Sequence, residues 1–217
     1  MGWQGIIYHT ANAGITWQKQ TSGANIDLKQ VVFVDAEHGW AMGADMLVAT
    51  TDGGQTWNSI GESKLSLQSI AFVDVQTGWG ILWDEQHDSK LARTNDGGAT
   101  WITQSTPTPP AGDFVLFLNK NEGWVSGHGI IHTSDRGQSW HSQRIPRADL
   151  SYERISFAGR KNGAAIHLGA MDTSRVGDVV RTRDGGLSWH VVSNSWLRPT
   201  TERVYREKFP GLTPGKH

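Results

Sequence analysis

Two short runs of the sequence combine side chains that enzymes use for catalysis or metal binding. Tyr152, Glu153 and Arg154 place a phenol, a carboxylate and a guanidinium together, and a tyrosine nucleophile with an acidic partner serves in some glycosidases. The run 84–88, Asp-Glu-Gln-His-Asp, offers carboxylate oxygens and an imidazole, which are ligands for metal ions. The first run suggests sugar chemistry and the second a metal site, and both depend on how the chain positions them.

Local structure argues against both chemistries. The Tyr-Glu-Arg run falls on a predicted strand whose alternate side chains point to opposite faces, so we expect Tyr152 and Arg154 to share one face and Glu153 to take the other. The acidic run lacks the ligand spacing of a calcium loop, and we interpret it as a solvated loop. We therefore predict no catalytic residue, no metal site and no cofactor.

The elements that position these runs are set by an eight-residue motif that recurs along the chain. Its clearest copy is Thr-Thr-Asp-Gly-Gly-Gln-Thr-Trp at residues 50–57. The acid or amide of the five copies is at Asn12, Asp52, Asp96, Asp135 and Asp184, and the closing indole is at Trp17, Trp57, Trp101, Trp140 and Trp189. These tryptophans are 40, 44, 39 and 49 residues apart, which is the period of a four-stranded propeller blade. We predict an all-β propeller of five repeats, either a five-bladed ring or part of a larger one.

Each motif has the composition of a tight turn between two strands. An acid followed by glycine suits a hairpin turn, because the acid accepts hydrogen bonds from backbone N–H groups and glycine tolerates a positive φ. The tryptophan then begins the next strand with a large ring that is buried between blades. Since chemistry needs one site rather than a fivefold array, we assign these residues a structural role.

A second motif precedes most copies of the first. Residues 33–40 read Phe-Val-Asp-Ala-Glu-His-Gly-Trp, and related runs occupy residues 72–79 and 117–124. A fourth run, 157–163, is followed by Ala164 where the others have tryptophan. The eight-residue motif resembles the Asp box of sialidases and other BNR-repeat propellers. Together, over about residues 1–192, the two motifs resemble the photosystem II assembly and stability factor family.

This resemblance implies a seven-bladed ring and a role without catalysis. In that family the partner is an early photosystem II intermediate, and members also occur in bacteria outside photosynthesis. The resemblance further suggests export to the periplasm or the thylakoid lumen, although no signal peptide is visible. We therefore expect a protein partner, either a photosystem-type assembly intermediate or another membrane or envelope protein, and no nucleic acid.

Two classes of enzyme share the Asp box, and the sequence lacks what each requires. A sialidase needs three converging arginines and an arginine-containing motif near its amino terminus, and this motif is absent. Xyloglucan-cleaving propellers place two carboxylates across a cleft between two rings, whereas five repeats supply one ring. Carbohydrate binding stays open as the alternative, because an exposed Trp83 would stack on a pyranose ring. Packing of Trp83 on its own loop is the plainer interpretation.

The length and composition are those of one domain with a short tail. The chain has 217 residues and no cysteine, and no apolar run approaches the ~20 residues of a membrane span. We assign residues 1–196 to the propeller and residues 197–217 to a tail. Gly2-Trp3 begins where the second strand of a blade should begin, so the strand before it is missing. Either the chain is part of a longer exported protein, or the tail supplies that strand and closes the ring.

Charge is distributed unevenly along the chain. Residues 1–130 hold 6 Lys and Arg against 13 Asp and Glu, a net of −7, whereas residues 131–217 hold 14 against 8, a net of +6. Propeller connectivity places the blade-to-blade links and the second-to-third loops on one face, opposite the Asp boxes. We predict that Arg144, Arg147, Arg154 and Arg175 form a basic, partner-binding area on that face. Plain solvation of scattered arginines is the alternative.

Overall fold

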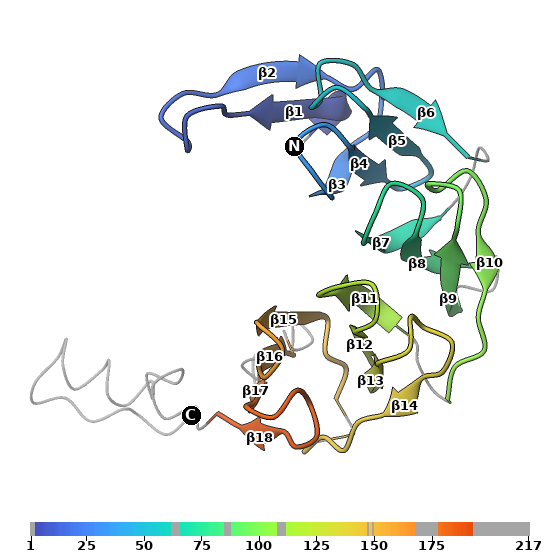
Figure 1. Cartoon of the computed structure of the whole chain (residues 1–217), viewed down its shortest axis with the longest axis vertical. Coiled ribbons are helices and arrows are strands. Elements are labelled where there is room, and N and C mark those ends of the chain that lie inside the picture. The colour runs from blue at the N-terminus through green and yellow to red at the C-terminus, as the bar shows by residue number, and fades with distance from the viewer. Residues whose placement is uncertain are drawn as a thin grey trace, which may run out of the picture.

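The chain folds as an all-β propeller whose blades follow an open arc (Figure 1). The computed structural model describes residues 3–61, 66–84, 88–107, 112–146, 148, 150–167 and 178–192. Within these residues there are four four-stranded sheets and one two-stranded sheet. The two-stranded sheet and the fifth sheet lie at opposite ends of the arc, so the described blades do not close a five-bladed ring. The tail at 197–217 lies outside the described residues, and its ring-closing role stays a prediction.

Consecutive strands of each sheet pair antiparallel. A 3-10 turn, η1 (Trp3–Gly5), precedes the first sheet, which consists of β1 (Ile6–His9) and β2 (Gln18–Thr21). The second and third sheets contain β3 (Leu28–Phe33), β4 (Gly39–Gly43), β5 (Leu47–Thr50) and β6 (Asn58–Ile60), then β7 (Leu67–Phe72), β8 (Gly78–Trp83), β9 (Ser89–Thr94) and β10 (Ile102–Thr103). The fourth and fifth contain β11 (Gly112–Phe117), β12 (Gly123–Gly127), β13 (Gly129–Thr133) and β14 (His141–Ser142), then β15 (Arg154–Ala158), β16 (Asn162–Ile166), β17 (Val179–Thr182) and β18 (His190–Val191).

The first strand of each four-stranded sheet is the innermost strand of its blade. Strands β3, β7, β11 and β15 line the inside of the arc, and β6, β10, β14 and β18 lie on its outside (Figure 1). The first repeat differs from the expectation that Trp3 opens a strand, because Trp3 lies in the 3-10 turn η1 with 81% of its surface exposed. The blades therefore present a shared inner surface made of four strands.

Each Asp box is closed by hydrogen bonds within its own turn. In the third repeat the Thr94 hydroxyl donates to Asp96 at 2.7 Å and accepts the backbone N–H of Gly98 at 2.9 Å. Asp96 also accepts the backbone N–H of Thr100 at 2.9 Å and the Thr100 hydroxyl at 2.6 Å. Gly98 has a φ of 98°, a value that costs any residue with a Cβ. The acid is thus held by the turn that it closes.

The boxes are also tied to the neighbouring turn of the same blade. The backbone N–H of Gly97 donates to the carbonyl of Gln76 at 2.9 Å, and Gly53 donates likewise to Glu37 at 2.9 Å. Gln76 and Glu37 lie in the turns between the first and second strands of their blades. The boxes and these turns therefore share one face of the propeller, and the links between blades lie on the other.

Tryptophan and phenylalanine rings join each blade to the next. Trp40 of the second blade stacks on Phe72 of the third with centroids 3.8 Å apart, and Trp101 meets the same Phe72 edge-on at 6.1 Å. The same arrangement recurs at the next two boundaries, where Trp79 stacks on Phe117 and Trp124 stacks on Phe157. One phenylalanine per boundary is therefore held between a ring of the preceding blade and the box tryptophan of its own blade.

A glycine makes room for each of these phenylalanines. A Cβ on Gly78 would lie 2.6 Å from the ring of Phe72, and this is closer than side chains approach one another. The Gly-Trp pair of the second motif is therefore a packing unit, in which the glycine receives the ring of its own blade and the tryptophan stacks on the ring of the next blade.

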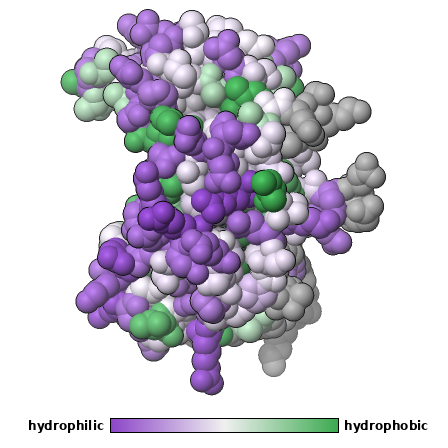
Figure 2. Space-filling model, turned by 45° about the vertical axis from the view of Figure 1, so that its right-hand side comes forward, coloured by the Kyte–Doolittle hydropathy of each residue, from purple (hydrophilic) through white to green (hydrophobic). Residues whose placement is uncertain are grey.

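The side of the molecule seen in Figure 2 carries no large apolar patch. Hydrophilic residues cover most of this face, and the hydrophobic residues on it are scattered. Among the described residues no helix has the length and hydrophobicity needed to cross a membrane.

We expect Asp96→Ala to lower the free energy of unfolding by about 1–3 kcal/mol, because several hydrogen bonds of the turn are lost together. Urea unfolding followed by tryptophan fluorescence measures this change. The control is Asn95→Ala, since Asn95 is exposed in the same turn. Equal midpoints for the two variants would contradict the assignment of the box acids to the fold.

Acid should weaken the fold through the same groups. The hydroxyl and then the backbone N–H of Thr56, Thr100 and Ser139 lower the pKa of Asp52, Asp96 and Asp135 from 3.8 to about 2. A carboxyl with a lowered pKa stabilises the fold above the unfolded value of the pKa, and this contribution is lost as the pH falls through the folded value.

We therefore expect the free energy of unfolding to fall between about pH 4 and pH 2. The difference between wild type and Asp96→Asn should be largest above about pH 4 and should shrink toward about pH 2, because the amide resembles the protonated acid. Urea titrations across this range measure the difference. A difference that stays constant with pH would contradict the role of the carboxylate.

Candidate binding groove on the innermost strands

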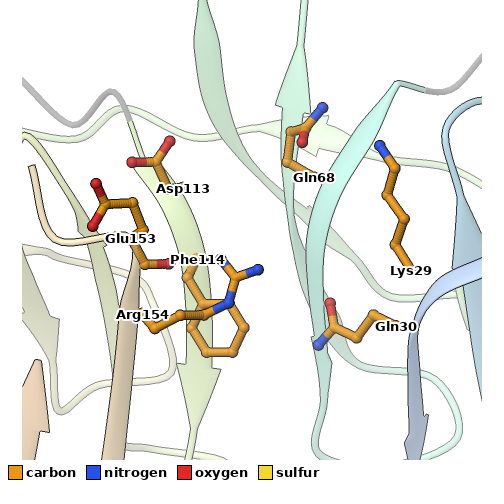
Figure 3. Close-up of a pocket in the computed structure, with 7 residues that line it drawn as sticks. All are labelled: Lys29, Gln30, Gln68, Asp113, Phe114, Glu153 and Arg154. Atoms are coloured by element: carbon orange, nitrogen blue, oxygen red, sulfur yellow. Dashed lines mark hydrogen bonds between the residues drawn. The ribbon is translucent and has the colours of Figure 1, made fainter. Parts of the chain in front are cut away.

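A groove of about 440 Å³ lies on the inside of the arc, where the four innermost strands meet. We call it the channel groove, and it is lined by Lys29, Gln30, Gln68, Asp113, Phe114, Glu153 and Arg154. Figure 3 shows Lys29 and Gln30 on one side of the groove and the Asp113 and Glu153 carboxylates on the other. Four blades thus contribute to one polar cavity, so the site exists only when the blades are assembled.

Bulges in the innermost strands aim side chains into the groove. The pairing register shifts between Leu28 and Gln30, between Leu67 and Ser69, and between Gly112 and Phe114. The residues skipped by these shifts are Lys29, Gln68 and Asp113. A bulge leaves one residue outside the ladder and turns its side chain, so the same position of three repeats faces the groove. Glu153, just before β15, holds this position in the fifth repeat, four residues before the phenylalanine of the second motif.

The residue after each bulge joins neighbouring blades. The Gln30 side-chain amide donates to the carbonyl of Ile70 at 2.9 Å and accepts the N–H of Ile70 at 3.0 Å. The Ser69 hydroxyl accepts the N–H of Val115 at 3.2 Å. These contacts tie β3 to β7 and β7 to β11, so the groove has a fixed spacing between its walls.

The fourth and fifth blades are joined at this level by a cation–π contact. The Arg154 guanidinium lies 5.1 Å from the centroid of the Phe114 ring, and one of its N–H groups donates to the carbonyl of Glu153 at 2.7 Å. A guanidinium carries five N–H donors, so Arg154 keeps donors for a ligand while it lies over the ring. Phe114 is the one aromatic side chain among the described lining residues.

The acidic side of the groove is organised by hydrogen bonds from the link before β15. The Ser151 hydroxyl donates to Asp113 at 2.9 Å. His167 Nδ1 lies 2.6 Å from the carbonyl oxygen of Ser151 and 3.4 Å from a carboxylate oxygen of Glu153. The groove therefore has an acidic wall with Asp113 and Glu153, and a basic side chain, Lys29, opposite.

The predicted arrangement of Tyr152, Glu153 and Arg154 is wrong. Strand β15 begins at Arg154, so strand alternation does not apply to the two residues before it. Glu153 and Arg154 both line the groove, whereas Tyr152 is fully buried and its hydroxyl donates to the carbonyl of Pro146 at 2.9 Å. A buried tyrosine that supports the core is not placed as a nucleophile for a sugar in the groove.

The structure places two of the four predicted binding arginines. Arg154 lines the channel groove, and Arg144 is exposed in the link between β14 and β15. Arg147 and Arg175 lie outside the described residues. Another arginine of the basic half, Arg160, is paired with both carboxylate oxygens of Glu122 at 2.8 and 2.6 Å. The groove around Arg154 is consequently of mixed charge, and the continuous basic area stays a prediction.

The acidic run 84–88 is engaged in local contacts where it is described. Lys90 forms an ion pair with Asp84 at 2.7 Å, and Asp84 accepts the backbone N–H of Asp88 at 2.8 Å. Glu85 and His87 lie outside the described residues. In the part of the chain that the structure describes, no group of three or more acidic, histidine or cysteine side chains is placed to hold a metal ion. Trp83 is 39% exposed.

Apart from Arg154, which was predicted to bind, and Glu153, which was assigned to the opposite face, the groove residues were not singled out in the sequence analysis. Their signal is a column of the repeat: the residue four positions before each phenylalanine is polar or charged in four repeats, namely Lys29, Gln68, Asp113 and Glu153. Strict strand alternation does not predict that the side chains at this position face the groove, because a bulge is visible only in the pairing of two strands.

Comparison with known families gives a match over most of the chain. The family described as photosynthesis system II assembly factor YCF48 matches residues 61–197. The photosystem II assembly lipoprotein Ycf48 of Synechococcus sp. (strain CC9902) is 30% identical over 104 residues, which cover 46% of this chain. The matching part spans 29% of the length of that lipoprotein.

Two further matches are a solved structure of a YCF48 protein and the sequence of a xyloglucanase. A solved structure of YCF48 bound to D1 peptide has a TM-score of 0.58 at 21% identity, and the match covers 81% of this chain and 54% of that chain. A xyloglucanase from Paenibacillus sp. is 21% identical over 229 residues, which cover 82% of this chain and 22% of the enzyme. The YCF48 structure shares the fold seen in Figure 1, and each of the two matches covers only a part of the other protein.

Proposed function

The chain belongs to the photosynthesis system II assembly factor YCF48 family, and we propose that it is a non-enzymatic scaffold that binds an extended segment of a protein partner in the channel groove. The observation that supports this proposal is the composition of the groove, in which a cation–π pair, two carboxylates and an opposed lysine surround a cavity of about 440 Å³. The partner is a photosystem-type assembly intermediate or another membrane or envelope protein.

The groove suits a polypeptide segment better than a flat protein surface. Its lining residues come from four blades, so a ligand that lies along it meets one or two side chains of each blade in turn. An extended segment presents side chains at regular intervals. A basic side chain of the segment would pair with Asp113 and Glu153, and an acidic one with Lys29. The D1 peptide bound by a related YCF48 supports a polypeptide ligand.

The predicted arginines provide the second part of the proposed surface. The planar guanidinium makes paired contacts with carboxylates and stacks on aromatic rings, and Arg154 already rests on Phe114. Arg144, on the link before β15, is exposed. Arg147 and Arg175, outside the described residues, complete the proposed set. Such groups contribute to the rate of association through long-range attraction.

Among the described residues, Ser139, Asp135 and His141 resemble a catalytic serine–histidine–acid triad in composition, but their hydrogen bonds run in the wrong order. Ser139 lies between Asp135 and His141, and its hydroxyl donates to Asp135 at 2.6 Å while His141 Nε2 lies 3.3 Å away. In a serine nucleophile the hydroxyl proton points to the histidine, and the acid orients the far side of that histidine. Ser139 instead closes an Asp box, which supports a role without catalysis.

We expect Arg154→Glu to weaken binding of a D1 peptide by about tenfold or more, because it replaces the guanidinium proposed to pair with carboxylates of the segment by a group that repels them. Most of the loss should appear in the association rate, and it should shrink as salt rises from about 50 to 200 mM. Surface plasmon resonance at several salt concentrations measures both quantities. Arg154→Gln, which removes charge without reversing it, should give a smaller loss.

The matched control is Lys161→Glu, which makes the same change of charge in an exposed turn of the same blade. Lys161 lies in the turn after β15, whereas Arg154 begins that strand, and Lys161 does not line the groove. Its reversal should therefore leave peptide binding unchanged. Equal affinities of the Arg154→Glu and Lys161→Glu variants for the peptide would contradict binding in the groove.

Carbohydrate binding is the second candidate function. It is supported by the similarity to a xyloglucanase, by the partly exposed Trp83 and by two carboxylates in the groove. A glycan array run beside the peptide assay separates the candidates. Binding of a xyloglucan oligosaccharide that Asp113→Asn or Trp83→Ala removes, without binding of any peptide, would favour this alternative.

A further inference from the structure

Gln68 lies in the middle of a row of three groove residues that come from neighbouring blades. Lys29 of β3, Gln68 of β7 and Asp113 of β11 are the residues at which the pairing register of these strands skips one position. Figure 3 shows Gln68 between Asp113 and Lys29. The second, third and fourth blades each have a described sheet on both sides (Figure 1). The row therefore belongs to the channel side of these blades and not to a face against which another blade packs.

The polar groups of this row keep hydrogen-bonding capacity for a ligand. Lys29 is exposed, and Gln68 and Asp113 are partly buried. Among the described residues, the side chains of Lys29 and Gln68 have no hydrogen-bond or ion-pair partner. Asp113 accepts the Ser151 hydroxyl with one carboxylate oxygen at 2.9 Å, which leaves its second oxygen for another donor. The row thus presents an ammonium, an amide and a carboxylate in that order.

Gln30 shows how a glutamine in this part of the propeller binds an extended chain. Its amide donates to the carbonyl of Ile70 at 2.9 Å and accepts the N–H of the same residue at 3.0 Å. A residue of an antiparallel strand exchanges the same two bonds with its partner on the next strand. Gln68 carries identical donor and acceptor groups, but it is the bulge residue of its blade and lines the groove.

We propose that Gln68 binds the main chain of a segment in the channel groove, through the same pair of hydrogen bonds that Gln30 forms with Ile70. Lys29 and Asp113 then select an acidic and a basic side chain on the two sides of the residue that Gln68 holds. This inference rests on the function proposed for the groove and adds the contact that makes the ligand a polypeptide. An unsubstituted sugar chain offers neither an amide N–H nor a carbonyl to such a pair of bonds.

The probe is the fluorescent peptide Ala-Glu-Ala-Arg-Ala, acetylated and amidated so that its ends carry no charge. Gln68→Met removes the amide and keeps the length of the side chain. In an anisotropy titration with the full chain it should weaken binding of this peptide about tenfold, because two hydrogen bonds are lost. The matched control is Gln76→Met, the same change in an exposed turn of the same blade, and its affinity should equal that of wild type.

A second peptide separates a main-chain contact from a change in the shape of the groove. It carries N-methylalanine between the two charged residues, so the N–H that Gln68 would accept is missing. Methylation should weaken binding to wild type about three- to tenfold. Gln68→Met cannot form this bond in any case, so the losses caused by methylation and by the substitution should not add.

The charges of the peptide test the two ends of the row. Wild type should bind the peptide with one glutamate and one arginine roughly fivefold more tightly than Ala-Arg-Ala-Arg-Ala, because Lys29 repels the second arginine. Lys29→Glu should reverse this preference, since the groove then offers a carboxylate at both ends of the row. Lys29 is exposed, so this change spares the core.

Equal affinity of wild type and Gln68→Met for the first peptide would overturn the proposal. Losses that add, a preference that Lys29→Glu leaves unchanged, or absence of binding of the first peptide would do so as well. The D1 peptide tests the function of the groove separately. If Arg154→Glu weakens binding of the D1 peptide while these results are negative, the groove binds a segment but Gln68 does not hold its main chain.

Discussion

The packing of one phenylalanine between two tryptophans is the interaction on which the arrangement of blades depends. Phe72 receives Trp40 from the preceding blade and Trp101 from its own blade, and Phe117 and Phe157 are held in the same way. Large aromatic rings bury much apolar surface at a fixed geometry. Each sheet alone has too little core to be stable, so the blades are stabilised by their neighbours, as in other repeat proteins. At the first described boundary Phe33 meets Trp57 of its own blade and remains 44% exposed.

The Asp boxes and the inner strands have different roles in each blade. Hydrogen bonds of the boxes close the outer hairpins and tie them to the inner turns, which leaves the inner strands free to vary in sequence. The residue after each bulge then bonds to the next blade through Gln30 or Ser69. The bulge residues themselves face the channel groove. A rigid repeated scaffold with variable positions at one rim is a common way to build a binding site.

Much of the fold could be predicted from the repeats, because a turn motif and its spacing are local properties. The period of the tryptophans indicated four-stranded blades, and the described sheets have this form from the second repeat onward. The site could be predicted less well. Arg154 was selected on charge and lies in the groove, whereas Glu153 was assigned to the opposite face and lines the same cavity. The error arose from treating the strand as regular before residue 154, where β15 begins.

The sequence by itself determined the all-β repeat architecture, the turn chemistry of the boxes and the family, since each follows from residues that lie close together in the chain. Only the tertiary structure decided which residues meet. The channel groove brings together Lys29 and Arg154, which are far apart in the sequence. The polar residues that face it lie at bulges, and a bulge forms only when two strands pair in a particular register. Register and blade packing are properties of assembled strands, so they cannot be predicted from the sequence of a single repeat.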